Sequence, residues 1–284
     1  MIPQQFEYSA PKTLDEALSL LADGAKPLAG GMSLIPMMKL RLAQPERLVD
    51  LGRIKDLNYI REQGSAIHIG ATATHYAVET SALLRGKCPL LAETAGFIGD
   101  VQVRNMGTIG GSVAHADPAA DYPAALQALE ARIVLKGAGS ERTVSADDFF
   151  VDTFTTALEP GEIVREIIVP LDGSGTGTSY QKVLQSASGF AIVGVAARVR
   201  KEGGKLAMVR VGITGLANRA FRATAVEQAL QGAGGSEAEL RAAAAQAADG
   251  VEANSDLHAS ADYRRHLATV YTARALAAAL GRIA

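Results

Sequence analysis

The hydrophobic positions of the chain follow a helical spacing in some stretches and a strand-like alternation in others. Near the start, a capping-box pattern at Thr13 and Glu16 precedes an apolar face with helical spacing, and Asp23-Gly24 then ends the pattern. The apolar residues of this face are Leu14, Ala17, Leu18 and Leu21. Residues 47–51 alternate apolar and polar positions, as a half-buried strand does. The pattern therefore predicts that helices and strands interleave from the N-terminus on.

Between these two elements, residues 25–42 contain an apolar approach, a glycine pair and Ser33, which is placed to cap a second helix. The apolar face of that helix is expected to consist of Leu34, Met37, Met38 and Leu42. Residues 58–71 have the pattern of two short strands joined by a turn at Gln63-Gly64. Further on, the spacing predicts one helix and then two strands, over residues 121–129, 131–137 and 162–170.

The second half of the chain begins after a glycine-rich stretch, "GSGTGT" at residues 173–178, which is typical of a flexible join. We therefore place a domain boundary there, between residues 1–175 and residues 176–284. Three strand-like runs follow and predict a small antiparallel meander, over residues 179–184, 190–200 and 205–216. From Arg219 on, the chain is rich in Ala with helical spacing. Helices packed on the meander are therefore expected at the C-terminal end.

Composition and charge narrow the classes of function. With 284 residues, 48% of them hydrophobic and 20% charged, the chain is long and apolar enough for two cores. Its formal net charge of -2 argues against a nucleic-acid partner. Cys88 is the only cysteine, which excludes an internal disulfide framework and an iron-sulfur cluster ligated by this chain. The five histidines are scattered and have no cysteine partners, so we assign no metal site.

The N-terminal residues have no basic start followed by an apolar run, and no apolar stretch is long enough to span a bilayer. A single cysteine also fits a reducing compartment. We therefore expect a cytoplasmic protein without a membrane span.

Two stretches combine a glycine pair, a hydroxyl side chain and the start of a helix. These are "LAGGMSL" at residues 28–34 and "VRNMGTIGGSVAHADPAADYPAAL" at residues 103–126. Glycine in a loop often only relieves backbone strain, and that structural interpretation suits a single pair. Two such loops that converge present successive backbone N–H groups to one diphosphate, because glycine allows close approach. Neither loop has the G-x-G-x-x-G or the G-x-x-x-x-G-K-[ST] spacing, so a Rossmann fingerprint and a Walker loop are both absent.

The two loops together resemble the paired flavin loops of the FAD-binding medium subunit of the molybdenum hydroxylases, the family of xanthine dehydrogenase and aerobic carbon monoxide dehydrogenase. The resemblance extends over the whole chain. It implies an α+β fold: a two-subdomain FAD-binding domain of the PCMH (vanillyl-alcohol-oxidase-like) type, followed by a C-terminal three-stranded antiparallel sheet with a helical bundle. The subdomains are expected at about residues 1–55 and 56–175.

The resemblance also assigns cofactor-binding residues. The first flavin loop falls on Ala29, Gly30, Gly31, Met32, Ser33 and Leu34, and the second falls on Thr108, Ile109, Gly110, Gly111 and Ser112. In the first loop, backbone N–H groups and the Ser33 hydroxyl are expected to meet the diphosphate. Asp121 is expected to accept hydrogen bonds from ribityl or ribose hydroxyls, and Val164 is expected to pack near the flavin. Lys182 matches a cofactor-facing lysine, where a cation would stabilise negative charge on the flavin.

Two positions depart from the family pattern. Met32 stands where the carbon monoxide dehydrogenase branch usually has His, so covalent attachment of the flavin there is excluded and FAD is expected to bind non-covalently. Ser112 stands where the second loop usually has Asn, which makes more hydrogen bonds than Ser. His115 and Phe190 each have two interpretations. His115 either contacts the flavin or is simply packed or solvated, and Phe190 either stacks near the flavin or belongs to the core.

The resemblance implies a division of labour between subunits. A large subunit would carry the molybdopterin cofactor, a small subunit would carry 2Fe-2S clusters, and the FAD of this chain would pass electrons to a terminal acceptor. We expect a heterotrimer that pairs into a dimer. Two alternatives are a stand-alone flavin oxidoreductase of the same fold and a non-catalytic scaffold subunit whose glycine loops are structural. The substrate and the acceptor stay open, because the substrate is selected on another chain.

Overall fold

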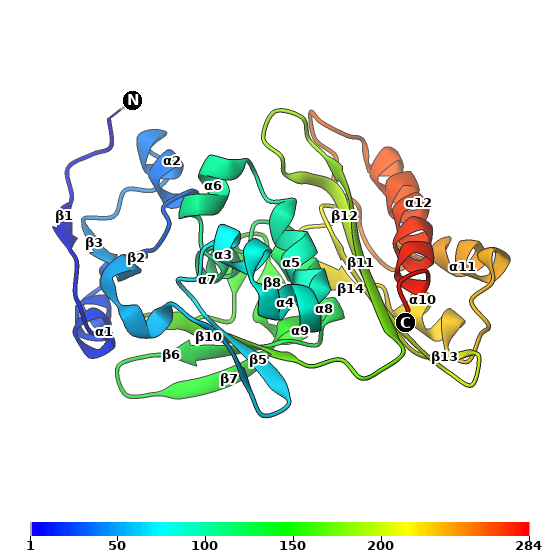
Figure 1. Cartoon of the computed structure of the whole chain (residues 1–284). Helices are drawn as coiled ribbons and strands as arrows, with labels where there is room; N and C mark the ends of the chain where they lie inside the picture. Colours follow the sequence, from blue (N-terminus) through cyan, green and yellow to red (C-terminus); the bar gives the residue numbers. More distant parts are fainter. Residues whose placement is uncertain (1, 284) are drawn as a thin grey trace.

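The computed structural model describes residues 2–283, and it arranges three larger sheets and their helices from the N-terminal to the C-terminal end (Figure 1). The N-terminal unit contains a three-stranded parallel sheet in the order β1-β3-β2, with two α-helices and two 3-10 helices. Its elements are β1 (Glu7–Ser9), α1 (Leu14–Ala22), β2 (Lys26–Leu28), α2 (Leu34–Lys39), β3 (Arg47–Asp50), η1 (Leu51–Arg53) and η2 (Lys55–Leu57).

Helix α1 begins and ends where the sequence predicts. The Thr13 hydroxyl accepts from the Glu16 N–H, and Gly24 after the helix has a φ of +86°. The capping box is only half formed, because the Glu16 carboxylate accepts from the Lys12 N–H instead of the Thr13 N–H. The buried face of α1 consists of Ala17, Leu18 and Leu21.

Helix α2 is shorter than the apolar spacing predicts. It ends at Lys39, so Leu42 lies outside the helix and is 72% exposed. Ser33 precedes the helix, but its side chain makes no capping hydrogen bond. Leu42 lies outside because residues 40–42 turn away from the helix axis, with Arg41 at a φ of +59°. Ser33 does not cap because its own backbone is in the helical region, with a φ of -106° and a ψ of -51°, whereas a capping residue is extended.

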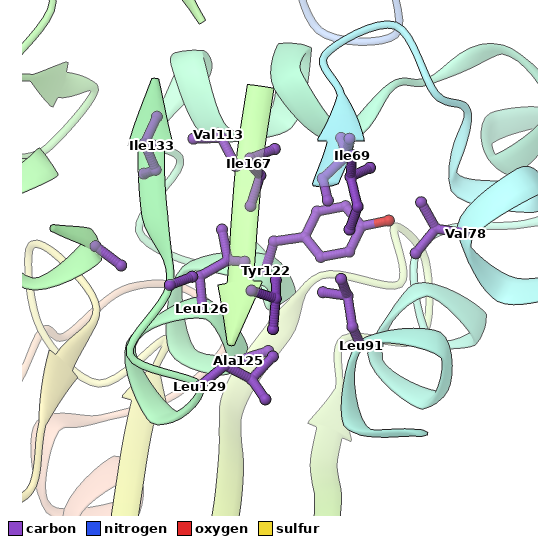
Figure 2. Packing of buried hydrophobic residues seen from close by; sticks show 14 of the residues in the cluster. Ile69, Val78, Leu91, Val113, Tyr122, Ala125, Leu126, Leu129, Ile133 and Ile167 are labelled. Atoms are coloured by element: carbon purple, nitrogen blue, oxygen red, sulfur yellow. The ribbon is translucent and has the colours of Figure 1, made fainter. Parts of the chain in front are cut away.

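The central unit has a five-stranded antiparallel sheet in the order β4-β5-β10-β6-β7. Ile69, Ile133 and Ile167 point from this sheet toward the helices, where they pack around Tyr122 and Leu126 (Figure 2). The strands are β4 (Ile60–Gln63), β5 (Ala66–Gly70), β6 (Arg132–Lys136), β7 (Glu141–Ser145) and β10 (Ile163–Pro170), with a small hairpin of β8 (Phe150–Asp152) and β9 (Thr155–Thr156). The helices are α3 (His75–Thr80), α4 (Ala82–Lys87), α5 (Pro89–Gly96), α6 (Val101–Met106), α7 (Ile109–His115), α8 (Asp121–Ala128) and α9 (Ala146–Phe149).

The C-terminal unit has four antiparallel strands in the order β11-β12-β13-β14, where the sequence predicts three. The extra strand has only two residues, which is too short for an alternating pattern to reveal. In addition, the flexible join predicted at residues 173–178 is shorter in the structure, because β11 already begins at Thr176. The elements are β11 (Thr176–Leu184), β12 (Ala191–Glu202), β13 (Lys205–Thr214), β14 (Phe221–Arg222), α10 (Thr224–Leu230), α11 (Glu237–Ala244) and α12 (Ala261–Leu280).

Helix α8 joins the central and C-terminal units. All its residues are buried, and it packs against β12 and β13 of the C-terminal sheet. The approach is close: a Cβ on Gly212 would lie 2.0 Å from the carbonyl oxygen of Ala124. Since α8 begins at Asp121, its charged first residue is enclosed between the two units.

Candidate cofactor site

The two glycine loops meet in the structure, although about 75 residues separate them in the sequence. A Cβ on Gly30 would lie 2.0 Å from the carbonyl oxygen of Met106, at the end of α6. A Cβ on Gly111 would lie 3.8 Å from the Cβ of Ala29. The bare backbone at Gly30 is therefore needed to bring the loops together, before any ligand is considered.

The first loop contains a row of free donors. Within residues 2–283, none of the backbone N–H groups from Ala29 to Leu34 donates a hydrogen bond to a protein acceptor. Gly31 has a φ of +74°, in the left-handed region that suits glycine. Successive N–H groups around such a residue form a concavity that binds anions. Since buried or half-buried N–H groups are nearly always paired, this loop fits the diphosphate of a dinucleotide.

The second loop uses its donors differently. The Ile109 N–H donates to the Ala73 carbonyl at 3.0 Å, and the Gly110 N–H donates to the Ala71 carbonyl at 2.9 Å. The Gly111 N–H donates to the hydroxyl of Thr108, the N-cap of α7, at 3.2 Å. These bonds fasten the start of α7 to the chain that leaves β5. The second loop therefore supports the first loop. Of these three N–H hydrogen bonds, the bond of Gly111 is the longest.

A buried ion pair closes the junction between the central and C-terminal units. The Lys182 Nζ atom lies 2.9 Å from the Asp121 carboxylate and donates to the Phe97 carbonyl at 3.0 Å. The Tyr180 hydroxyl donates to Oδ1 of Asp121 at 2.5 Å. Loss of hydration raises the pKa of Asp121 to about 6, although Lys182 and Tyr180 both lower it. The structure thus brings the two predicted residues Asp121 and Lys182 into contact.

The other predicted residues occupy different surroundings. Val164 is buried in the central core, opposite Leu135 on β6. Ser112 is half-buried on α7, and Met32 is 38% exposed.

Two aromatic side chains had open interpretations. Phe190 is 42% exposed in the turn between β11 and β12, so the interpretation of Phe190 as a core residue is wrong. The His115 ring is half-buried, with its centroid 5.0 Å from that of Phe154, and burial lowers its pKa.

Sequence reasoning missed His75 and Tyr180. His75 is buried, its Nδ1 lies 3.2 Å from the Tyr122 hydroxyl, and a Cβ on Gly107 would lie 2.6 Å from its Nε2. Burial, together with the charge of Arg104, lowers the pKa of His75 to about 4, so the ring is neutral at pH 7. Both side chains act on residues that are distant in sequence, so no local motif reveals them.

Two open surface hollows, of about 330 and 470 Å³, lie on the flanks of α5 and are not lined by either glycine loop. The larger one is lined by residues such as Lys87, Asp172 and Arg282. In the part of the chain that the structure describes, no helix combines the length and the apolar character that crossing a membrane requires.

Comparison with known proteins identifies the family of the chain. A family model described as the FAD binding domain in molybdopterin dehydrogenase matches residues 4–172, and one described as the CO dehydrogenase flavoprotein C-terminal domain matches residues 178–279. The chain is 44% identical to the carbon monoxide dehydrogenase medium chain of Hydrogenophaga pseudoflava, with all of both chains covered. It is 38% identical to the glyceraldehyde dehydrogenase medium chain of Sulfolobus acidocaldarius, with 97% of this chain and 98% of that protein covered.

A solved structure gives the same result for the fold. The carbon monoxide dehydrogenase of Hydrogenophaga pseudoflava that lacks the Mo-pyranopterin moiety of its cofactor contains a chain that is 46% identical and superposes with a TM-score of 0.97, with 100% of each chain covered. The fold of the whole chain therefore belongs to one known architecture. The chain belongs to the family of FAD-binding medium subunits of molybdenum hydroxylases, which includes the carbon monoxide dehydrogenase and xanthine dehydrogenase flavoproteins.

Proposed function

We propose that the first loop binds the diphosphate of FAD through the backbone N–H groups of residues 29–34 and the hydroxyl of Ser33. The observation that carries this proposal is the row of N–H groups that find no acceptor within residues 2–283, beside a Ser33 hydroxyl that makes no capping bond there. Thr108, Ile109, Gly110 and Ser112 hold the second loop in place under it. Gly111 contributes a further N–H group to the diphosphate when this N–H no longer donates to the Thr108 hydroxyl. Met32 leaves the flavin without a covalent bond to the chain.

The flavin end of the cofactor is proposed to lie toward Asp121, Val164 and Lys182. A carboxylate has about four acceptor positions, and Lys182 and Tyr180 use two of those on Asp121. Asp121 therefore keeps the capacity to accept from a ribityl or ribose hydroxyl. Val164 contributes apolar packing from β10. Lys182 contributes an ammonium group that Asp121 balances, in surroundings where charges are weakly screened.

Within an oxidoreductase of this family, the chain is an electron-transfer subunit. FAD accepts electrons singly and delivers them in pairs, which is the chemistry that the group supplies when bound. The residues of this chain bind the cofactor, orient it and exclude water from it. We propose that the electrons come from the 2Fe-2S clusters of a small partner subunit and originate at a molybdopterin cofactor on a large one, since the chain's single cysteine, Cys88, is buried.

The assembly and the domain organisation are part of the same proposal. We infer a dimer of heterotrimers in the cytoplasm, with a PCMH-type FAD-binding domain at residues 1–175 and a C-terminal domain at residues 176–284. The two family models, which match residues 4–172 and 178–279, support a boundary near residue 175. Native mass spectrometry of the chain expressed with its partner genes tests the assembly, and equal copies of three chains are expected.

The test of the diphosphate site compares two glycines of similar backbone conformation. Gly31 has a φ of +74° and Gly24 a φ of +86°, so valine is strained at both, but only Gly31 lies in the loop. The assembled enzyme with Gly31→Val is expected to lose most of its FAD, whereas Gly24→Val keeps it. The FAD-to-protein ratio after gel filtration is measured together with far-UV circular dichroism. A folded Gly31→Val variant with a full flavin complement would contradict the site, and a colourless wild-type assembly would favour the scaffold alternative.

A further inference from the structure

The buried ion pair of Asp121 and Lys182 has a third member, Tyr180. Tyr180 and Lys182 are two residues apart on β11, so their side chains project from the same face of the strand. Both reach Asp121 at the start of α8, Tyr180 at 2.5 Å and Lys182 at 2.9 Å. The Tyr180 side chain is fully buried. Its hydroxyl is therefore available to the Asp121 carboxylate and not to water.

The neighbouring strand has a gap that accommodates this hydroxyl. Gly194 on β12 is paired with Lys182, and a Cβ on Gly194 would lie 2.3 Å from the Tyr180 hydroxyl oxygen. Any larger residue there would push the hydroxyl away from Asp121. Gly194 has an ordinary strand conformation, so the requirement for glycine comes from packing and not from the backbone. The glycine at position 194 thus leaves the room that the hydrogen bond from Tyr180 to Asp121 requires.

A single segment connects this cluster to the first glycine loop. The Phe97 carbonyl accepts from Lys182, and the Met106 carbonyl packs on Gly30. Between them lies α6, whose six residues have a length of roughly 9 Å at 1.5 Å per residue. The ion pair and the diphosphate loop therefore flank the same short helix, which is consistent with one extended cofactor that meets both.

We propose that Tyr180 is a positioning residue that keeps Asp121 ionised against Lys182, and thereby sets the charge that the chain presents to the flavin. This inference rests on the proposed function, since it needs FAD to be bound. An ionised carboxylate without water requires donors, and among residues 2–283 Tyr180 and Lys182 donate to the Asp121 carboxylate. While Asp121 is ionised, it neutralises the ammonium group of Lys182. If Asp121 takes up a proton, the positive charge of Lys182 is left uncompensated.

Removal of the Tyr180 hydroxyl shifts this balance in a defined direction. Burial and the nearby Asp117 raise the pKa of Asp121, Lys182 and Tyr180 lower it, and the balance of these effects places it at about 6. Without the Tyr180 hydrogen bond, the protonated form of Asp121 becomes more favourable at pH 7. The uncompensated ammonium group then stabilises negative charge on the flavin, so the midpoint potential of the bound flavin rises.

The experiment measures the midpoint potential of FAD in the assembled enzyme. Tyr180→Phe is expected to raise the reduced-to-oxidised ratio at a given applied potential at least tenfold, which is about 30 mV for a two-electron couple. The matched control is Tyr59→Phe, which also removes a tyrosine hydroxyl that donates to a carboxylate, that of Glu166 on β10, the middle strand of the central sheet. The control is expected to keep the wild-type potential.

Gly194→Ala provides a second variant that keeps the tyrosine side chain and places a methyl group against its hydroxyl. It is expected to shift the potential in the same direction as Tyr180→Phe. If both variants keep the wild-type potential while they retain FAD, the inference is overturned and the proposed function stands. If the wild-type assembly binds no FAD, the proposed function fails and the inference fails with it.

Discussion

Gly110 packs directly on Ala71: a Cβ on Gly110 would lie 2.4 Å from the Ala71 Cβ and 2.7 Å from the Ala71 carbonyl oxygen. The same carbonyl accepts the Gly110 N–H at 2.9 Å. Gly111, the next residue, faces only the Thr108 hydroxyl at 2.8 Å and the Ala29 Cβ at 3.8 Å. The two glycines of one pair therefore have different tasks. Gly110 fastens α7 to the central sheet, and Gly111 faces the first loop.

We expect Gly110→Ala to destabilise the protein by about 1–3 kcal/mol, since the added methyl group meets backbone that cannot move aside. Gly111→Ala is expected to cost less than about 1 kcal/mol, because the Thr108 side chain can rotate and alanine favours the helix. For FAD affinity the opposite is expected: Gly111→Ala weakens FAD binding more than Gly110→Ala does. Thermal unfolding and FAD titration of both variants check this. Equal losses of stability would show that the pair acts as one structural unit.

Ser33→Ala separates the role of the hydroxyl from helix capping. Because the Ser33 side chain makes no capping hydrogen bond, the melting temperature of the apoprotein is expected to stay unchanged. A hydrogen bond to a charged phosphate contributes roughly 1.5–3 kcal/mol, so FAD affinity should fall about 10- to 100-fold. Isothermal titration with FAD provides the measurement, and Ser19→Ala on α1 is the exposed control. A lower melting temperature with normal affinity would assign Ser33 to the helix instead.

The pH dependence of stability is expected to contain two opposite contributions. The folded-state pKa of Asp121 is raised from 3.8 to about 6, so its contribution is fully present below pH 3.8 and is lost as the pH rises through about 6. The folded-state pKa of His75 is lowered from 6.5 to about 4, so its contribution is present above pH 6.5 and is lost as the pH falls through about 4. Each shift corresponds to about 3 kcal/mol. Between pH 4 and 6 the two slopes oppose each other in the wild type.

Single substitutions should reveal each slope. In Asp121→Asn, the free energy of unfolding is expected to fall more steeply than in the wild type as the pH drops from 6.5 to 4. In His75→Gln, the same pH drop is expected to increase the free energy of unfolding. Urea unfolding at pH 4.5, 5.5 and 6.5 measures both. Parallel pH profiles in the wild type and the two variants would refute this assignment.

Much of the fold could be predicted from local pattern. Residues 13–24 contain a cap, an apolar face and a stop signal, and α1 forms there because all three act within a few residues of chain. The strand at 47–51 and the hairpin at 58–71 are confirmed for the same reason. The two-residue strand β14 was missed, since it exists only through its pairing with Gly212 and Ile213.

The sequence by itself determined which segments form the loops and that their glycines and hydroxyls suit a diphosphate, because these properties depend on neighbours in the chain. Only the tertiary structure decided how the glycines divide their tasks. Gly30 and Gly110 are bare because Met106 and Ala71 pack against them. The N–H groups of the first loop are free because, in the part of the chain that the structure describes, no distant acceptor reaches them. Likewise, Asp121 is charged and buried only because β11 brings Tyr180 and Lys182 to the start of α8. Contacts between residues so far apart leave no periodicity in the sequence, since the folded backbone alone sets which side chains share a site.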